Sequence, residues 1–399
     1  MLNRLKAILA DFFQQADLVL LGLCCVSTLY GMVLIASATH YKGTAGMIRY
    51  VGVQGVAMAL GICAYIFMSM VDVEILIKKW KWLVVFNVVF IGLLLTPFGV
   101  GGETTGNQAW LKFPGIPFQI GPAEVVKITF TLLLAKQLEW LREEKRDLKS
   151  FPAAFMVAGH TIALMGWYVV ISGDMGNALT FFFIFLCMAF AAGFALRWFA
   201  LLFAGMGAGV AAVILLDQAQ KIPESMSYML ERFKVLFDHS YDSLGVGWHQ
   251  TRSLLALGSG GVFGQGYMNG TQTQSSYSSS LPYRWTDFIF SACGEELGMV
   301  GCVVIILLLA AVIVRVLLVA KNSQTQFHRY VCVGVAAMLI YQTIVNIGMC
   351  LFVMPTIGIT LPFFSYGGSS LLTLYAAMGV VSGIKKRSPT MGRPGRPMR

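Results

Sequence analysis

Apolar runs of about 20 residues recur along the whole chain and constrain its fold more than any other feature. Only 12% of the residues are charged, whereas soluble domains carry about 25%. A large soluble helical protein would need a polar stripe on most of its helices, and these runs lack one. The sequence therefore predicts an all-α polytopic membrane protein.

Ten apolar segments predict ten transmembrane helices. They run over about 18–37, 50–70, 82–97, 123–141, 151–172, 174–193, 198–216, 288–319, 330–353 and 365–384. The eighth segment is too long for one span, so its first turns are expected to lie at the surface or to line a cavity. The first segment is expected to remain as a helix, because no convincing small-residue cleavage site follows it.

The loops between these segments give the orientation, because Lys and Arg favour the cytoplasmic side. One set of ends carries basic clusters, at 78–81, 142–149 and 385–399 for example, whereas the opposite short loops hold only Lys42, Arg49 and Lys112. Both termini are therefore predicted to be cytoplasmic. The net charge of +10 belongs to this pattern and does not indicate a nucleic-acid partner.

Residues 1–387 are predicted to form one membrane domain, followed by a disordered basic cytoplasmic tail at 388–399. Two sizeable loops are then extracellular, at about 98–122 and at 217–286 between the seventh and eighth helices. The second is too long for a simple connector. Its residues 226–239 predict an interfacial helix, 253–266 a re-entrant or packed segment, and 271–280 a polar flexible stretch.

Asp287 lies where the long loop meets the eighth apolar segment. Two interpretations are open. Thr286 or Asp287 could cap the free amides of the eighth helix. Alternatively, Asp287 is a carboxylate at the outer mouth of a membrane cavity and acts as a general base.

Other candidate site residues are also ionisable or aromatic. Glu124 and Lys127 lie three residues apart at the start of the fourth segment, as a structural ion pair or as a pair that also binds a ligand. Trp110 could anchor the first outer loop at the membrane interface or stack on a sugar. Asp174 could cap the sixth helix. Arg252, Arg284 and Lys234 are external cations, suited to phosphate or pyrophosphate and otherwise solvated.

The cysteines and histidines do not indicate a metal centre. The chain has 8 Cys and 5 His, with no Cys-x-x-Cys pair and no His pair at ligand spacing. The glycine-rich stretches 258–261 and 264–266 lack the flanking strand and helix of a nucleotide-binding loop.

Three motifs make the sequence resemble the SEDS family, the bacterial shape, elongation, division and sporulation proteins typified by RodA and FtsW. They are Trp-Thr-Asp-Phe-Ile-Phe at 285–290 with Gly-Glu-Glu-Leu-Gly at 294–298, Leu-Gly-Ser-Gly-Gly at 257–261, and the stretch 355–370. The resemblance extends from the first segment to Ile384. Gly-Thr-Gln-Thr-Gln at 270–274 is more similar to the RodA branch than to the FtsW branch.

The resemblance implies a ten-helix peptidoglycan glycosyltransferase that polymerises lipid II, an undecaprenyl-pyrophosphate glycan, outside the bacterial cell membrane for cell elongation. It implies that Asp287 is the essential aspartate and that Glu124 and Lys127 are the Glu-x-x-Lys pair. Implied partners are a class B penicillin-binding protein, which is a transpeptidase, and the membrane proteins of the elongation complex. A divalent cation, Mg²⁺ or Mn²⁺, is left open as a cofactor.

The chain departs from the family pattern at several positions. Trp285 stands where the family has His, and Ala109 stands where it has Arg. The Phe-Gln-Pro-Ser-Glu pattern is two residues longer at 118–124, Gln-Pro-Asp reads Ser-Gly-Asp at 172–174, and Gln-Ser reads Arg-Ser at 252–253.

In the implied reaction Asp287 takes a proton from the attacking sugar hydroxyl, and Arg252, Arg284 or a cation holds the pyrophosphate. Two other functions are alternatives, namely a transporter that flips lipid II and a non-catalytic scaffold of a cell-wall complex. A transporter predicts titratable groups through the membrane midplane and two related halves, whereas the charged groups here lean to the outer side. A division or sporulation role of the FtsW type is the alternative within the family.

Overall fold

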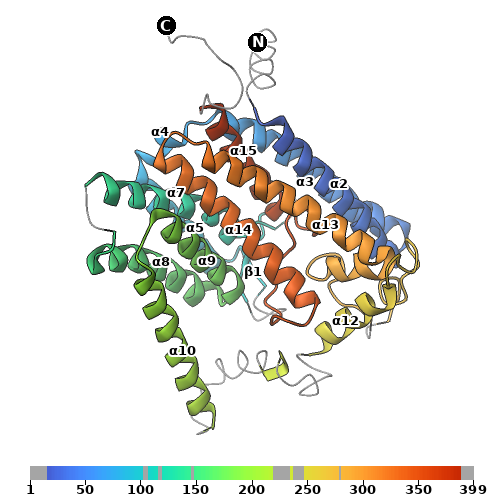
Figure 1. The fold of residues 1–399 in the computed structure, drawn as a ribbon. Coiled ribbons are helices and arrows are strands. Elements are labelled where there is room, and N and C mark those ends of the chain that lie inside the picture. The colour runs from blue at the N-terminus through green and yellow to red at the C-terminus, as the bar shows by residue number, and fades with distance from the viewer. Residues whose placement is uncertain are drawn as a thin grey trace, which may run out of the picture.

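The computed structural model describes residues 16–101, 107–115, 119–144, 148–218, 234–236, 247–277 and 280–387. The predicted interfacial helix at 226–239 and the predicted tail at 388–399 lie mostly or wholly outside this range. The helices are α2 (Leu18–His40), α3 (Gly43–Met70), α4 (Val73–Ile77), α5 (Trp80–Gly92), α7 (Pro122–Glu143), α8 (Phe151–Ser172), α9 (Met175–Ala192), α10 (Leu196–Gln218), α12 (Trp248–Gly260), α13 (Ile289–Lys321), α14 (Gln326–Cys350) and α15 (Gly368–Lys386), with a short 3-10 helix η1 at Leu93–Leu95 (Figure 1).

Each of the predicted apolar segments coincides with a helix. Among the described residues, seven helices are long and apolar enough to cross a membrane, namely α2, α3, α8, α9, α10, α13 and α14. The helices α5, α7 and α15 coincide with the other three segments and do not meet the same criterion of length and composition. A multi-pass membrane protein is therefore established, whereas ten spans remain a prediction.

Small residues let α15 lie directly against α3. A Cβ atom at Gly379 would come within 2.5 Å of the Tyr65 carbonyl oxygen, and one at Gly383 within 2.8 Å of the Ser69 carbonyl oxygen. Close backbone approach of this kind drives helix association where lipid removes the hydrophobic effect between helices. The last helix is thereby fixed beside the second apolar helix, and its first residues are fixed at the candidate site.

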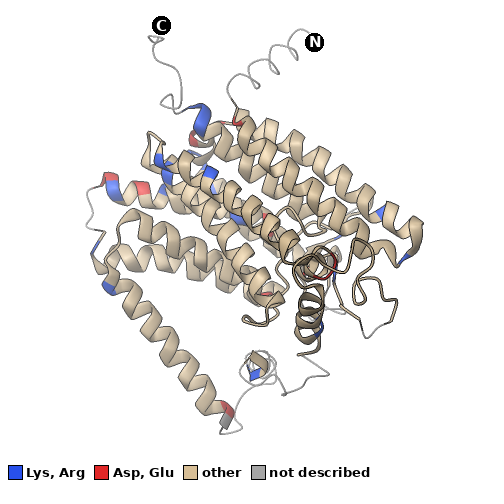
Figure 2. Cartoon of the chain, turned by 45° about the vertical axis from the view of Figure 1, so that its right-hand side comes forward, with Lys and Arg blue, Asp and Glu red and all other residues tan. Residues whose placement is uncertain are grey.

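The start of α2 and the end of α15 lie at the same end of the bundle. The buried carboxylate of Asp17 accepts two hydrogen bonds from Arg315, at 2.9 and 3.0 Å, and pairs with Lys385 at 3.1 Å. This network also explains Arg315, a charge inside the long helix α13, because intramembrane charges are paired. Figure 2 shows further Lys and Arg residues gathered toward this end of the molecule.

The long helix α13 is broken at Gly298, which has φ 65° and ψ −164°. The glycine-rich segment after α12 supplies hydrogen-bond partners for the backbone groups that the break frees. Gln265 N and Gly266 N donate to the carbonyls of Glu295 and Glu296, at 2.9 and 3.0 Å. In return, the carbonyls of residues 261 and 262 accept from Met299 N and Val300 N, at 3.0 and 3.2 Å.

This exchange gives hydrogen-bond partners to the backbone groups of a broken helix inside the protein. Irregular backbone at membrane depth requires such partners, because lipid supplies none. It needs glycine on both sides. A Cβ atom at Gly260 would lie 1.9 Å from the Gly294 carbonyl oxygen, and on the α13 side one at Gly298 would lie 2.4 Å from Gly264 N. The motifs at 257–261 and 294–298 thus form one structural unit. The packed-segment prediction for 253–266 agrees with this arrangement.

A two-stranded ribbon departs from the all-α prediction. Strand β1 (Gly99–Val100) pairs antiparallel with β2 (Trp110–Leu111), and Leu111 also bridges to Ile120. The ribbon folds the first outer loop back onto the start of α7 and so places Trp110 there. By contrast, α10 extends away from the other helices (Figure 1), and none of its most apolar window is buried.

Candidate active site

Asp287 lies in the turn directly before α13, but it does not cap that helix. The N-cap position is Phe288, without a side-chain hydrogen bond, and Thr286 Oγ1 donates backward to the Tyr283 carbonyl at 3.3 Å. The capping interpretation is therefore wrong for both residues. Among the residues that the structure describes, none donates a hydrogen bond to the Asp287 carboxylate.

The backbone of Asp287, unlike its carboxylate, is held firmly. Its carbonyl oxygen accepts from Asn346 Nδ2 at 2.8 Å and from Cys350 Sγ at 3.8 Å. One residue earlier, the Thr286 carbonyl accepts from Ser365 Oγ at 2.6 Å. Helix α14 and the α14–α15 connection thus fix the turn, while the half-buried carboxylate stays available.

The surroundings of Asp287 suit a general base. Withdrawal from water, and to a smaller extent the negative charge of Asp174, together raise its pKa to about 6. A base works best when its pKa lies near the working pH, because it is then both deprotonated and basic. Perturbed values of this kind are frequent at functional sites.

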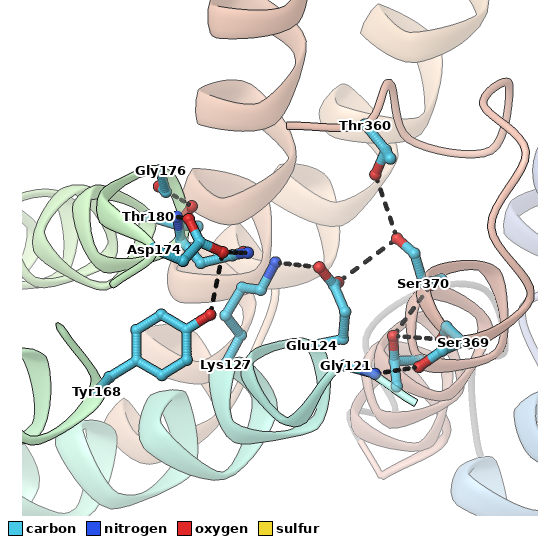
Figure 3. Close-up of polar contacts among 12 residues, drawn as sticks. Gly121, Glu124, Lys127, Tyr168, Asp174, Gly176, Thr180, Thr360, Ser369 and Ser370 are labelled. Carbon is cyan, nitrogen blue, oxygen red and sulfur yellow. Dashed lines mark hydrogen bonds and ion pairs between the residues drawn. The ribbon is translucent and has the colours of Figure 1, made fainter. Parts of the chain in front are cut away.

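Glu124 and Lys127 form a buried ion pair at the start of α7, with Lys127 Nζ 2.8 Å from Glu124 Oε1 (Figure 3). Lys127 is 0% exposed and Glu124 is 8% exposed. The other carboxylate oxygen, Glu124 Oε2, accepts from Ser370 Oγ at 3.4 Å. The sequence spacing predicted this pair, and the structure places it between α7 and the first turn of α15.

Several polar residues of this region carry no role in the sequence interpretation. Ser370 also contacts Thr360 Oγ1 at 3.5 Å, and Ser369 Oγ accepts from Gly121 N at 3.2 Å (Figure 3). Their stretch, 355–370, was recognised as a motif without an assigned chemistry. Asn346, a polar residue within an apolar segment, was the clearest unused signal.

Asp174 is the N-cap of α9, as one interpretation predicted. Its carboxylate accepts from Asn177 N at 3.2 Å, Asn177 Nδ2 at 2.7 Å and the Tyr168 hydroxyl at 3.0 Å. Electrostatic interactions join it to Asp287, and join Tyr168 to Glu124. The helix starts of α7, α9 and α13 thus bring three carboxylates into one polar region.

Trp110 packs against the start of α7. A Cβ atom at Gly121 would lie 3.1 Å from the Trp110 ring and 3.4 Å from Glu124 Cγ, so glycine leaves room for the indole beside Glu124. The ring is half-exposed. A half-exposed indole keeps part of its apolar ring accessible.

The predicted cations have different surroundings. Arg284 is buried and donates to the carbonyls of Gln272, Thr273 and Ser275, which gives it a structural role rather than a free charge. Lys234 pairs with Asp217 at 2.6 Å. Arg252 is half-buried with its guanidinium 4.0 Å from the Trp248 ring centroid, and its buried Nε has no hydrogen-bond partner among the described residues.

A divalent cation would not find a protein cage in the described part of the chain, where no three His, Cys, Asp or Glu side chains lie close enough together to hold a metal ion. Glu124 and Asp174 are occupied by the partners given above, which leaves Asp287 as one available carboxylate. Mg²⁺ is often bound by one or two carboxylates together with substrate phosphates. Mg²⁺ or Mn²⁺ would therefore depend on a phosphate-bearing substrate for most of its ligands.

Comparison with known proteins places this site in a family. The family model described as cell cycle protein (FtsW, RodA, SpoVE) matches residues 17–389. The probable peptidoglycan glycosyltransferase FtsW of Trichlorobacter lovleyi is 32% identical over 95% of this chain and 96% of its own length. The peptidoglycan glycosyltransferase MrdB of Escherichia coli K12 is 31% identical over 82% of this chain and 83% of its own length.

Solved structures agree with these relatives. One, described as "Structural coordination of polymerization and crosslinking by a peptidoglycan synthase complex", matches with a TM-score of 0.76 and 27% identity, over 94% of this chain and 99% of the other. The rod shape determining protein RodA of Thermus thermophilus matches with a TM-score of 0.65 and 26% identity, over 94% and 98%. The chain therefore belongs to the FtsW, RodA and SpoVE family of cell cycle proteins, the SEDS family, and is a multi-pass protein of the bacterial cell membrane.

Proposed function

We propose that this protein is a peptidoglycan glycosyltransferase that polymerises lipid II at the outer face of the cell membrane, with Asp287 as the general base. One observation carries the assignment to Asp287. Its backbone is fixed by Asn346 and Cys350, while no described residue donates a hydrogen bond to its carboxylate. A carboxylate that is positioned but unpaired is available to take a proton from a substrate.

The proposed reaction joins a sugar hydroxyl to the anomeric carbon of lipid II. A new carbon–oxygen bond forms at that carbon, the bond to the pyrophosphate breaks, and undecaprenyl pyrophosphate leaves with the electron pair. Asp287 accepts the hydroxyl proton. Because pyrophosphate is a good leaving group, positive charge near it is of more use than a strong general acid. A divalent cation would supply such charge when bound with the substrate.

The other site residues take supporting roles in this proposal. The Glu124–Lys127 pair forms a wall of the substrate cavity, and Trp110 offers its ring to a sugar. Asp174 raises the basicity of Asp287 through its charge. Arg252 is the protein cation proposed for the pyrophosphate, because its guanidinium has no hydrogen-bond acceptor at Nε within the described part of the chain, whereas both terminal nitrogens of the Arg284 guanidinium donate to backbone carbonyls.

The proposed topology has ten spans and both termini in the cytoplasm. It is supported by the joint position of the α2 start and the α15 end, which an even number of spans requires. It is also supported by the basic residues at that end (Figure 2). Asp287 then faces outward, where lipid II presents its sugars.

A transpeptidase of the class B penicillin-binding type is the proposed partner, together with other membrane proteins of the elongation complex. The likeness to a synthase complex that couples polymerisation to crosslinking supports such a partner. We assign the protein to cell elongation because of the RodA-like stretch 270–274. The relatives bear both branch names at 32% and 31% identity, so complementation of elongation-depleted and division-depleted cells is the deciding measurement.

Purified protein with labelled lipid II tests the activity, with and without a transpeptidase partner. We expect glycan polymer from the wild type and none from Asp287→Ala, with both proteins equally folded by thermal unfolding. Full activity of Asp287→Ala would refute the base assignment. Movement of lipid II across vesicles without polymer would favour a flippase, and an inert protein that restores cell shape would favour a scaffold.

A further inference from the structure

Two buried carboxylates follow one another at the break in α13. Glu295 is 0% exposed and Glu296 is 2% exposed. Glu296 accepts from Ser37 Oγ, from Met268 N at 3.2 Å and from Gln274 Nε2 at 2.6 Å. Buried carboxylates are stable only when such donors replace water. The proposed reaction uses neither residue.

Glu295 organises the segment 271–273. Its Oε1 accepts from Thr271 Oγ1 at 3.0 Å and Gln272 N at 2.7 Å. Its Oε2 accepts from Thr273 N at 2.7 Å and Thr273 Oγ1 at 2.6 Å. Four charge-assisted hydrogen bonds on one carboxylate fix the segment's amides toward α13.

Arg284 holds carbonyls of the same stretch and of Ser275 just beyond it, so that the whole segment is 271–275. Its guanidinium donates to the carbonyl oxygens of Gln272 at 2.7 Å, Thr273 at 2.5 Å and Ser275 at 2.8 Å. It also lies 3.7 Å from the centroid of the Tyr41 ring. The segment therefore lies between a buried carboxylate and a buried guanidinium. Its amides donate to Glu295, and its carbonyls accept from Arg284.

The turn from Arg284 to Asp287 is tight. Both Thr286 N and Phe288 N donate to the Tyr283 carbonyl, at 3.0 and 3.1 Å. Tyr283 itself has φ +47°, a strained conformation that persists only when its surroundings hold it. A shift of the Arg284 backbone would therefore also shift the backbone of Asp287, which belongs to the same turn.

We propose that Glu295 and Arg284 are positioning residues that set the place of the Asp287 carboxylate through segment 271–275. The inference rests on the proposed role of Asp287 as base. Neither residue touches substrate in this account. Small misplacements of a reacting group are costly, since about 1 Å can reduce a rate roughly 100-fold.

Glu295→Gln and Arg284→Lys test the proposal by steady-state polymerisation of lipid II in the full-length protein. Each variant keeps a side chain of similar length but loses part of its hydrogen-bond pattern. We expect kcat to fall roughly 10- to 100-fold in each, with KM for lipid II nearly unchanged. The double variant should lose little more than either single variant, because both act through one segment.

Three results would overturn the proposal. They are a wild-type kcat in both variants, a raised KM at unchanged kcat, which would mean substrate binding, and multiplicative losses in the double variant. Asp17→Asn is the matched control, because it alters a buried, paired carboxylate at the other end of the bundle. It should lower the unfolding temperature and leave kcat unchanged, which separates positioning from general loss of stability.

The outcome for Asp287 separates the two proposals. If Asp287→Ala is inactive and Glu295→Gln is fully active, only the positioning role fails. If Asp287→Ala is fully active, the base assignment fails regardless of Glu295.

Discussion

The side-chain amide of Asn346 donates to the backbone carbonyl of Asp287 at 2.8 Å and to that of Ile359 at 2.7 Å. One buried residue of α14 thus joins the turn before α13 to the connection before α15. Its partners lie 59 and 13 residues away along the chain. The contact fixes the main chain at Asp287 and leaves the carboxylate to the chemistry.

The raised pKa of Asp287 predicts an acid limb in the pH profile. With a pKa of about 6, the base loses its deprotonated form below that pH, so kcat/KM should fall about tenfold per pH unit and level off above it. The measurement is polymerisation at low lipid II concentration. Asp174→Asn removes a like charge but keeps a capping side chain, so it should move the limb to lower pH. An unshifted limb would contradict the electrostatic link between the two residues.

The Glu124–Lys127 pair should respond to mutation as a unit. Glu124→Gln or Lys127→Met leaves one buried charge unpaired, which costs about 3–5 kcal/mol of unfolding free energy. The double variant removes both charges, so we expect it to lose less stability than the sum of the single variants. Thermal or denaturant unfolding of the purified variants checks this cycle. Additive losses would show that the residues do not interact.

The same double variant tests the function of the pair. If the pair lines the substrate cavity, a stable double variant stays inactive in lipid II polymerisation. Restored activity would mean that the pair only holds α7 in place.

Local patterns in the sequence were sufficient for much of this architecture. The apolar runs located the helices, and the three-residue spacing of Glu124 and Lys127 predicted their ion pair. Asp174 was correctly a candidate cap, because an acid directly before an apolar run satisfies nearby amides. Each of these features depends on residues within one helical turn or on simple periodicity.

Long-range contacts decided the features that the sequence did not predict. Asp287 has the sequence position of a cap, yet the turn around Tyr283 starts the helix one residue later, with Phe288 at the N-cap position. The break at Gly298 depends on hydrogen bonds to residues 261–266, which lie beyond the short range that local sequence propensity describes. Arg284 resembles a free external cation until the carbonyls of segment 271–275 are placed around it.

Gly298→Ala should destabilise the protein strongly. At φ 65° and ψ −164°, a side chain costs about 1–3 kcal/mol from backbone strain alone. In addition, the new Cβ atom would lie 2.4 Å from Gly264 N and from the Val262 carbonyl oxygen. Gly205→Ala in α10 is the control, because its Cβ atom would meet nothing within 4 Å. Equal unfolding temperatures for the two variants would refute the account of the broken helix.

Trp285→His introduces the residue that the family resemblance implies at this position. It should remove a contact between the α2–α3 connection and the Asp287 turn. The Lys42 ammonium lies 3.8 Å from the Trp285 ring centroid and donates to the Tyr50 hydroxyl at 3.0 Å, so the indole ties the α2–α3 connection to the Asp287 turn. Exposed cation–π contacts contribute about 0.5–1 kcal/mol, and we expect a loss of that size in unfolding free energy.

In the Trp285→His background, Lys42→Met should then cost less unfolding free energy than it does in the wild type. The control is Trp82→His, at a ring that is 73% exposed on α5, where Lys42→Met should keep its full cost. An equal cost of Lys42→Met in all three backgrounds would show that Lys42 gains nothing from Trp285.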